Sequence, residues 1–129
     1  MPAIALNHYN LRAPRALLLQ LKEFYCEVIG LQAGARPPFD NFGFWLYAGD
    51  QAVLHLSEAR AGDIRHTDTA TTFDHVAFSC VDPEEMEACL QAHALPYQVA
   101  FVPSMQQKQI FLRDPAGNGV ELNFAQASK

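Results

Sequence analysis

Four side chains of the types that bind divalent metals recur at nearly constant spacing along the chain. The interval from His8 to His75 is only one position longer than the interval from His55 to Glu121. Two copies of one folding unit place such residues at equivalent positions, and a pseudo-twofold arrangement can bring them to one point. Imidazole and carboxylate groups are ligands of Zn²⁺ and related ions. The spacing therefore predicts a metal site formed by His8, His55, His75 and Glu121.

Glu121 strengthens this prediction more than any single histidine does. It lies in Gly119-Val120-Glu121-Leu122-Asn123-Phe124, an alternating strand pattern in which a carboxylate is costly to bury without a partner. A divalent ion would be such a partner. Imidazole and carboxylate ligands suit Zn²⁺, Ni²⁺, Fe²⁺, Mn²⁺ and Co²⁺, so the cofactor is predicted as a divalent metal whose element stays open. His66 and His93 lie outside the repeat, and we interpret them as solvated or packing residues.

The elements that must position these residues are predicted to follow one order twice. In the first module, residues 1–57, a strand is expected at 4–11, and Pro14 suits the first turn of the helix that follows. Apolar residues at helical spacing continue to Gly30, a plausible C-terminal stop. Further strands are expected at 31–35, 42–48 and 51–57. This module reads βαβββ.

Residues 58–71 are polar and without period, which predicts a linker. The second module, residues 72–129, opens with a strand at 72–80. Asp82 is then expected to cap a helix that has Pro83 in its first turn and Glu85 three residues after the cap. That helix is expected to continue to His93. Strands at 97–102, 107–113 and 119–124 complete a second βαβββ module.

The register between the modules supports a duplication more strongly than their low sequence identity does. Trp45-Leu46 falls on Phe111-Leu112, and Leu54-His55-Leu56 falls on Val120-Glu121-Leu122, with one common offset. The predicted fold is therefore α+β, built from two βαβββ modules.

Length and composition indicate one compact domain over residues 1–129. Half of the residues are hydrophobic, and each module alone, at about 60 residues, would be only marginally stable. The modules are therefore expected to share an interface or to exchange across a homodimer. The net charge of −5 with scattered Lys and Arg argues against nucleic acid as a partner.

The sequence also bears on the expected compartment. No apolar run approaches the roughly 20 residues of a membrane span, and residues 1–4 do not begin a secretory signal, so a cytoplasmic location is expected. Cys26, Cys80 and Cys89 have no close-spaced pair, and we interpret them as buried thiols. The remaining expected partner is a small-molecule substrate.

Three stretches of the chain carry a recognisable family pattern: Phe24-Tyr25 with Ile29-Gly30-Leu31, Phe73-Asp74-His75-Val76-Ala77-Phe78, and the segment from Phe111 to Leu122. They resemble the vicinal oxygen chelate superfamily, which includes glyoxalase I, methylmalonyl-CoA epimerase, extradiol dioxygenases, and the fosfomycin- and bleomycin-resistance proteins. The last resembles the family ending Asp-Pro-x-Gly-Asn-x-x-Glu-Leu and is the most specific. The resemblance covers nearly the whole chain. It implies two βαβββ modules that form a curved mixed sheet around a metal, often with a second chain completing the site.

By this resemblance, His8, His75 and Glu121 match the family's usual ligand positions. His55 departs from the pattern, because glyoxalase I-like members carry Glu there as ligand and proton-transfer base. The resemblance implies a divalent-metal-dependent lyase or isomerase of glyoxalase I type that binds two oxygens of a small substrate. The predicted catalytic residues are His55 and Glu121, either of which would move a proton between adjacent carbons. Whether His55 is a ligand or an acid–base group stays open.

The resemblance also allows three alternative functions, each known from other members of the superfamily. The first is an extradiol-type Fe²⁺ dioxygenase, in which His8, His75 and Glu121 hold iron and His55 acts as an acid–base group. Its aromatic substrate would lie against residues chosen from Phe39, Phe42, Phe44, Trp45 and Phe101. Against it, Phe111 stands in the stretch where those enzymes place a Tyr.

The second alternative is sequestration of a small molecule without chemistry, as bleomycin-resistance members are thought to do. Those members generally lack ligands at the metal positions, whereas this chain has all four filled. The third is fosfomycin thiol transfer, which would need a cluster of cations for the phosphonate. The candidate cations are scattered along the chain: Arg12, Arg36, Arg65 and Arg113.

Overall fold

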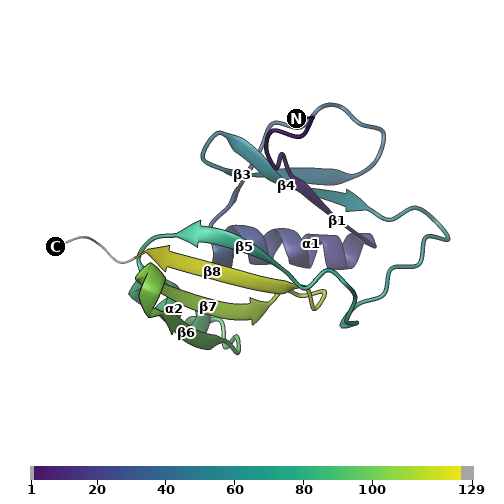
Figure 1. The fold of residues 1–129 in the computed structure, drawn as a ribbon. Coiled ribbons are helices and arrows are strands. Elements are labelled where there is room, and N and C mark those ends of the chain that lie inside the picture. Colours follow the sequence, from purple (N-terminus) through teal and green to yellow (C-terminus); the bar gives the residue numbers. More distant parts are fainter. Residues whose placement is uncertain (1, 126–129) are drawn as a thin grey trace. The chain divides into compact units, whose positions relative to one another are not determined.

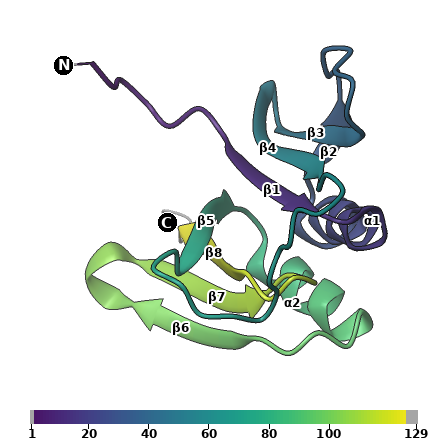
Figure 2. The ribbon, with the colours of Figure 1, turned by 90° about the vertical axis from the view of Figure 1, so that its right-hand side faces the viewer.

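The computed structural model describes residues 2–125, which fall into two compact units. Unit 1 is Met1–His66 and unit 2 is Thr67–Lys129. Each unit contains its own four-stranded mixed sheet and one main helix (Figure 1, Figure 2). The predicted α+β class and the twofold βαβββ order are therefore confirmed. The single domain over 1–129 and the homodimer stay predictions.

Unit 1 forms its sheet from four strands in the order β1-β4-β3-β2. Strand β1 is parallel to β4, and the other neighbouring pairs are antiparallel. A helix and a π-helical segment connect β1 to β2. The elements are β1 (Tyr9–Ala13), α1 (Arg15–Glu23), η1 (Phe24–Ile29), β2 (Gln32–Gly34), β3 (Gly43–Ala48) and β4 (Gln51–Glu58).

The helical segment of unit 1 ends where the sequence predicts. Leu18 and Leu21 are buried on α1, and the helix continues into the π-turn η1 before it stops at Gly30. Gly30 has φ 98°, a left-handed conformation that residues with a Cβ rarely adopt. The amides of Gly30 and Leu31 donate to the Tyr25 carbonyl oxygen at 3.1 and 2.9 Å. These bonds use the terminal carbonyl that the helix leaves unpaired.

Alternating side chains give the unit 1 sheet two different faces. Lys22 of α1 lies over the Phe44 ring, with Nζ 4.9 Å from its centroid, so Phe44 is on the face that α1 covers. Leu54 and Leu56, on the same face, are fully buried. Successive strand residues point to opposite sides, which puts Trp45 on the other face. We call this side of each sheet, the side away from its own main helix, the helix-free face.

Unit 2 repeats the arrangement, with strand order β5-β8-β7-β6 and β5 parallel to β8. Lys108 Nζ on β7 pairs with Glu87 of α2, so Lys108 faces α2 and Phe111 lies on the helix-free face. The elements are β5 (His75–Cys80), α2 (Pro83–Ala92), β6 (Gln98–Val102), η2 (Pro103–Met105), β7 (Gln107–Arg113) and β8 (Gly119–Ala125).

The strand register confirms the predicted repeat residue by residue. In the parallel ladders, Asn10 lies opposite His55 and Ala77 lies opposite Glu121. In the antiparallel ladders, Trp45 lies opposite His55 and Phe111 lies opposite Glu121. A register slip of one residue would move every side chain to the other face. His55 and Glu121 are therefore equivalent residues on equivalent faces.

The first strand of each module begins later than the sequence predicts. We expected strands at 4–11 and 72–80, whereas β1 begins at Tyr9 and β5 begins at His75. The parallel ladder of unit 1 starts with Tyr9 opposite Leu54, and Leu6 is 84% exposed. The apolar and polar residues that alternate over 4–8 therefore do not mark a buried strand. His8, expected within a strand, lies directly before β1.

The predicted cap of the second helix is wrong. Asp82 precedes α2 and Pro83 is its first residue, but Asp82 is left-handed, with φ 60° and ψ 70°, and its side chain makes no capping hydrogen bond. A capping side chain needs the extended conformation to reach the amides of the first turn. His93, expected to continue the helix, is its C-terminal cap residue.

Candidate metal centre

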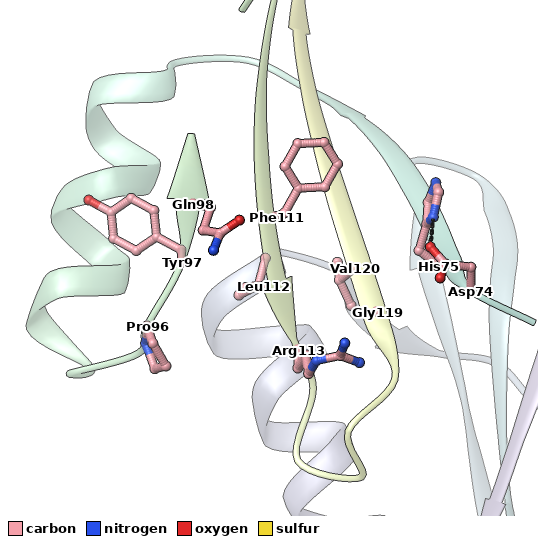
Figure 3. Close-up of a pocket in the computed structure, with 10 residues that line it drawn as sticks. All are labelled: Asp74, His75, Pro96, Tyr97, Gln98, Phe111, Leu112, Arg113, Gly119 and Val120. Carbon is pink, nitrogen blue, oxygen red and sulfur yellow. Dashed lines mark hydrogen bonds and ion pairs between the residues drawn. The ribbon is translucent and has the colours of Figure 1, made fainter. Parts of the chain in front are cut away.

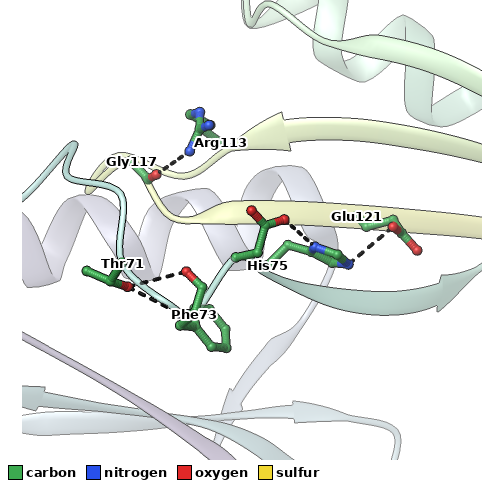
Figure 4. A network of polar contacts seen from close by, with 7 residues as sticks. Thr71, Phe73, His75, Arg113, Gly117 and Glu121 are labelled. Carbon is green, nitrogen blue, oxygen red and sulfur yellow. Dashed lines mark hydrogen bonds and ion pairs between the residues drawn. The ribbon is translucent and has the colours of Figure 1, made fainter.

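Unit 2 brings two of the predicted ligands into contact. His75 is the first residue of β5, and Glu121 lies on β8, the parallel neighbour. His75 Nε2 lies 3.3 Å from Glu121 Oε1 (Figure 4). The Glu121 side chain is 13% exposed and that of His75 is 40% exposed. A mostly buried carboxylate beside an imidazole nitrogen is an arrangement that a cation can complete.

The second ring nitrogen of His75 also has a partner. Its Nδ1 lies 2.8 Å from Asp74 Oδ2, and in unit 1 the Nδ1 of His8 lies 2.7 Å from Asn7 Oδ1. Asn7 and Asp74 directly precede the two histidines, so they are separated by the same interval. An oxygen acceptor on one ring nitrogen of a metal-binding histidine fixes the tautomer and leaves the other nitrogen for the ion. Both histidines are thus set to present Nε2.

Sequence reasoning missed the roles of Asn7 and Asp74. The signal was present, because each precedes its histidine directly and the two share the repeat spacing. When residues with side-chain oxygens lie next to two candidate ligands and repeat at the same spacing, they are themselves candidates for holding the ligands in place.

Unit 1 brings the other two predicted ligands together in a stack of three rings. The centroids of His8 and His55 are 3.7 Å apart with planes inclined by 13°, and those of Trp45 and His55 are 4.0 Å apart at 11°. Trp45 and His55 are cross-strand neighbours on β3 and β4. The His55 ring therefore lies between the other two, with one face covered by each.

The environment of His55 favours its neutral form. Burial lowers the pKa of His55 from the ordinary value of 6.5, and the nearby His8 lowers it further, while a hydrogen bond with the Ala52 backbone acts in the opposite direction. A neutral imidazole has a lone pair with which to bind a metal or to accept a proton. His55 is therefore suited to either predicted role at neutral pH.

A cavity of about 550 Å³ opens beside His75 on unit 2 (Figure 3). Phe111 and Arg113 of β7 and Gln98 of β6 line it, and His75 with Asp74 closes one side. The volume is that of a small-molecule site. Arg113 Nη1 donates to the Gly117 carbonyl oxygen at 2.9 Å, which holds the guanidinium at the edge of this cavity (Figure 4). Aromatic, amide and cationic groups thus surround the position next to the predicted ligand.

The loop between β7 and β8 is held by a buried carboxylate. Asp114 is 5% exposed, and its Oδ1 accepts hydrogen bonds from the amides of Ala116 and Asn118 at 2.9 and 3.0 Å. Its Oδ2 accepts a third from Asn118 Nδ2 at 3.0 Å. A buried carboxylate used in this way organises a loop. The Asp-Pro-Ala-Gly-Asn segment therefore acts as scaffold for β8, the strand that carries Glu121.

The donor groups fit a divalent ion, and each unit supplies one pair of them. Imidazole nitrogen and carboxylate oxygen are the ligand types of Zn²⁺, Ni²⁺ and Fe²⁺, and the oxygen partners of both Nδ1 atoms prepare His8 and His75 to ligate. Within either unit, residues 2–125 include no group of three His, Cys, Asp or Glu side chains arranged to hold an ion alone. Coordination by all four residues stays a prediction.

Only part of the predicted aromatic lining lies on a helix-free face. Trp45 does, and Phe39 is next to it, with ring centroids 6.2 Å apart. Phe44 faces α1, and Phe42 packs edge-on against Phe44. Phe101 lies opposite Lys108, on the side of the sheet that faces α2. Phe111, which was not among the residues expected to line a pocket, lines the unit 2 cavity together with Tyr97.

Burial makes two of the three cysteines poor nucleophiles. Cys26, Cys80 and Cys89 form no disulfide and are half-buried. Burial raises the pKa of the Cys26 and Cys80 thiols, which disfavours the nucleophilic thiolate. His93 Nδ1 lies 2.9 Å from the Cys89 carbonyl oxygen, a contact within the end of α2.

The sequence from residue 5 to residue 122 matches the Glyoxalase/Bleomycin resistance protein/Dioxygenase superfamily. The match spans both units, and the chain belongs to this superfamily. No curated protein sequence matches the chain. The resemblance noted in the sequence is thus confirmed at the level of the family.

Solved structures agree with this assignment of the fold. A glyoxalase family protein from Bacillus anthracis is 20% identical, with a TM-score of 0.74 and coverage of 96% of this chain and 97% of that one. Lactoylglutathione lyase from Agrobacterium tumefaciens is 25% identical, with a TM-score of 0.65 and 96% of each chain covered. The fosfomycin resistance protein FosX from Listeria monocytogenes, solved with Mn(II), is 11% identical, with a TM-score of 0.70 and coverage of 98% and 94%.

Proposed function

We propose that the chain is a divalent-metal-dependent lyase or isomerase of glyoxalase I type, acting on a small substrate that offers two neighbouring oxygens. The observation that carries this proposal is the contact between His75 Nε2 and Glu121 Oε1, with His75 Nδ1 held by Asp74. We propose that His8 joins this pair as a ligand of the metal and that His55 acts at the same site, either as a ligand or as an acid–base group. His55 is equivalent to Glu121 in the strand register, and His8 is equivalent to His75 by its spacing in the sequence.

Two further observations support the proposal. The cavity beside His75 can hold a small organic substrate and presents both an aromatic ring, Phe111, and a cation, Arg113. Among the solved structures, lactoylglutathione lyase is named for its activity and is similar over 96% of each chain. A lyase or isomerase reaction that moves a proton suits a site with a carboxylate and a weakly basic imidazole.

A bound divalent ion would stabilise negative charge that develops on the substrate oxygens. The chain itself supplies the proton transfer. Glu121 or His55 takes the proton from the hydroxyl-bearing carbon next to the carbonyl as that C–H bond breaks, and returns it to the former carbonyl carbon, while the hydroxyl proton moves to the other oxygen. The proton and the electron pair both stay within the substrate and the residue, so the step needs no external oxidant or reductant. Asp74 and Asn7 hold the histidine rings during the exchange.

The test combines metal analysis with one substitution. Protein purified without added metal is analysed for bound elements, stripped with a chelator, and assayed with thiohemiacetals before and after addition of Ni²⁺ or Zn²⁺. We expect activity to vanish with the metal and to return with it. Glu121→Gln keeps the size of the side chain and removes its charge, and we expect it to abolish both metal retention and turnover. Metal-independent turnover, or no turnover with any metal, would refute the proposal.

A second candidate function is an extradiol-type Fe²⁺ dioxygenase. The observation that favours it is the aromatic ring opposite each of the equivalent residues, Trp45 opposite His55 and Phe111 opposite Glu121, because such rings suit a planar substrate. Two histidines and one carboxylate are also the usual ligands of Fe²⁺ in oxygenases. Oxygen uptake with catechols after anaerobic loading with Fe²⁺ would favour this candidate over the first.

A further inference from the structure

The three-ring stack of unit 1 restricts how its two histidines can bind a metal. A histidine binds an ion through a nitrogen lone pair that lies in the plane of its ring, at about 2.0–2.1 Å for zinc. The His8 and His55 planes are inclined by only 13°, with centroids 3.7 Å apart. Two such planes do not meet near the rings, and one ion cannot lie in both. Joint coordination would require one ring to turn.

The surroundings of the two rings differ in how freely each can turn. His8 lies before β1, is exposed, and has one ring face against His55. His55 lies on β4, a strand paired on both sides, and both of its ring faces are covered. Turning His8 gives up one stacking contact, whereas turning His55 gives up two, including the contact with Trp45. The ring expected to move toward an ion is therefore that of His8.

We propose that Trp45 is a positioning residue that keeps His55 out of the metal's coordination sphere, so that His55 serves as the acid–base group and His8 as the histidine ligand from unit 1. This inference rests on the proposed metal-dependent function and deepens it. It assigns separate roles to two histidines that are alike in chemical type.

Trp45 offers a direct readout, because it is the only tryptophan in the chain. The full-length, metal-stripped protein is titrated with Zn²⁺, which has a filled d shell, while calorimetry follows binding and fluorescence follows Trp45. We expect saturating zinc to leave the emission maximum and intensity of Trp45 nearly unchanged. His55→Ala removes the stacked ring, so its Trp45 emission is the reference for a tryptophan that has lost this contact. Zinc-induced emission equal to that of His55→Ala would overturn the inference.

Variants test the same assignment through metal affinity. We expect His8→Ala to weaken zinc binding by about 100-fold or more, because loss of an outer partner alone typically costs 10–100-fold and a lost ligand costs more. His55→Phe keeps a ring for Trp45 to stack on and removes both nitrogens, and we expect its zinc affinity to stay within about threefold of the unchanged protein. Equal losses in His8→Ala and His55→Phe would overturn the inference.

The role of Trp45 needs a readout that simple loss of packing would not change. Pulsed EPR of the Cu²⁺-loaded protein counts coordinated imidazoles. We expect two in the unchanged protein, from His8 and His75, and three in Trp45→Leu, where His55 can turn. A count of three in the unchanged protein, or of two in Trp45→Leu, would overturn the assignment of Trp45.

The outcomes also separate this inference from the proposed function. If the unchanged protein binds no Zn²⁺, or binds it equally well in Glu121→Gln, both proposals fail. If binding depends on Glu121 and on His55 as strongly as on His8, the metal-dependent function stands and only the assignment of His55 and Trp45 fails.

Discussion

The two units share a backbone plan and differ in the side chains placed on it. In unit 1, the equivalent positions hold His8, His55 and Trp45 as a stack of flat rings. In unit 2, they hold His75, Glu121 and Phe111, with an imidazole and a carboxylate in polar contact. Strand register is maintained by hydrogen bonds between backbones and tolerates such exchange. A duplicated fold can therefore assign different chemical tasks to matching residues without changing its topology.

The largest expected effect concerns two buried leucines at equivalent positions of the two units. Leu56 and Leu122 are equivalent, and both are fully buried. We expect Leu56→Ala and Leu122→Ala each to lower the free energy of unfolding by about 2–5 kcal/mol, through lost burial and the cavity left behind. Thermal unfolding followed by calorimetry and far-UV circular dichroism measures both.

This pair of variants also tests the predicted single domain. In one cooperative domain, either substitution lowers the midpoint of the same transition. Two transitions, each shifted by only one of the variants, would contradict the single-domain prediction and show that the units unfold separately.

The turns between the last two strands of each unit give the next effect. Gly49 and Gly117 both have positive φ, 63° and 90°, but a Cβ on Gly49 would meet no atom within 4 Å, whereas one on Gly117 would lie 2.8 Å from Asp68 Cα. We expect Gly49→Ala to cost about 1–2 kcal/mol from backbone strain alone. Gly117→Ala should cost about 2–4 kcal/mol because of the added overlap. Equal costs in urea denaturation would contradict the tighter packing of the unit 2 loop.

The dependence of stability on pH should reveal His55, the imidazole that unit 1 has in place of Glu121. Because its pKa is lowered, His55 in the folded protein binds a proton only below the ordinary value of 6.5. Between the pKa of His55 in the folded protein and pH 6.5, the unfolded chain binds more protons than the folded one. The contribution of His55 to the free energy of unfolding is therefore complete above pH 6.5 and is lost as the pH falls through the pKa of the folded state. Trp45 emission of the metal-free protein, read against pH, should show a midpoint below 6.5. His8→Ala is the control and should raise that midpoint, because the charge of His8 helps to lower it.

The smallest effect concerns the attachment of α2 to its sheet. Lys108 Nζ pairs with Glu87, and the Tyr97 hydroxyl donates to the other oxygen of the same carboxylate at 3.0 Å. The equivalent position in unit 1 is Phe42, which packs on Phe44. We expect Lys108→Met to cost about 0.2–1 kcal/mol, a difference that shrinks in 1 M salt. A cost that is independent of salt would show that the aliphatic stem of Lys108, and not its charge, holds the helix.

The repeat register could be predicted from the sequence because alternation and spacing are properties of the chain. Two nearly equal intervals in the sequence align His55 with Glu121 and His8 with His75. The ladders confirm the first alignment, whereas His8 lies directly before β1 and outside the ladder. The starts of β1 and β5 could not be predicted in this way. Leu6 fits an alternating pattern but is exposed, and only a neighbouring strand decides whether such a residue is paired.

Side-chain geometry within the site was beyond the reach of the pattern. The sequence identifies two imidazoles in unit 1, but their near-parallel stacking depends on ring torsions and on Trp45, whose partner is across the sheet. The failed cap at Asp82 has a similar origin. Its residue types were suitable, but its backbone is left-handed and its side chain makes no capping hydrogen bond.

The π-turn at the end of the first helix has a consequence for chain length. Phe24–Ile29 winds more residues into each turn than an α-helix does, which is how a helix absorbs a single inserted residue without disturbing the segments around it. Deleting one residue there would convert the wide turn into an ordinary one. The chain thus carries a place where its length can change by one while Gly30 still terminates the helix.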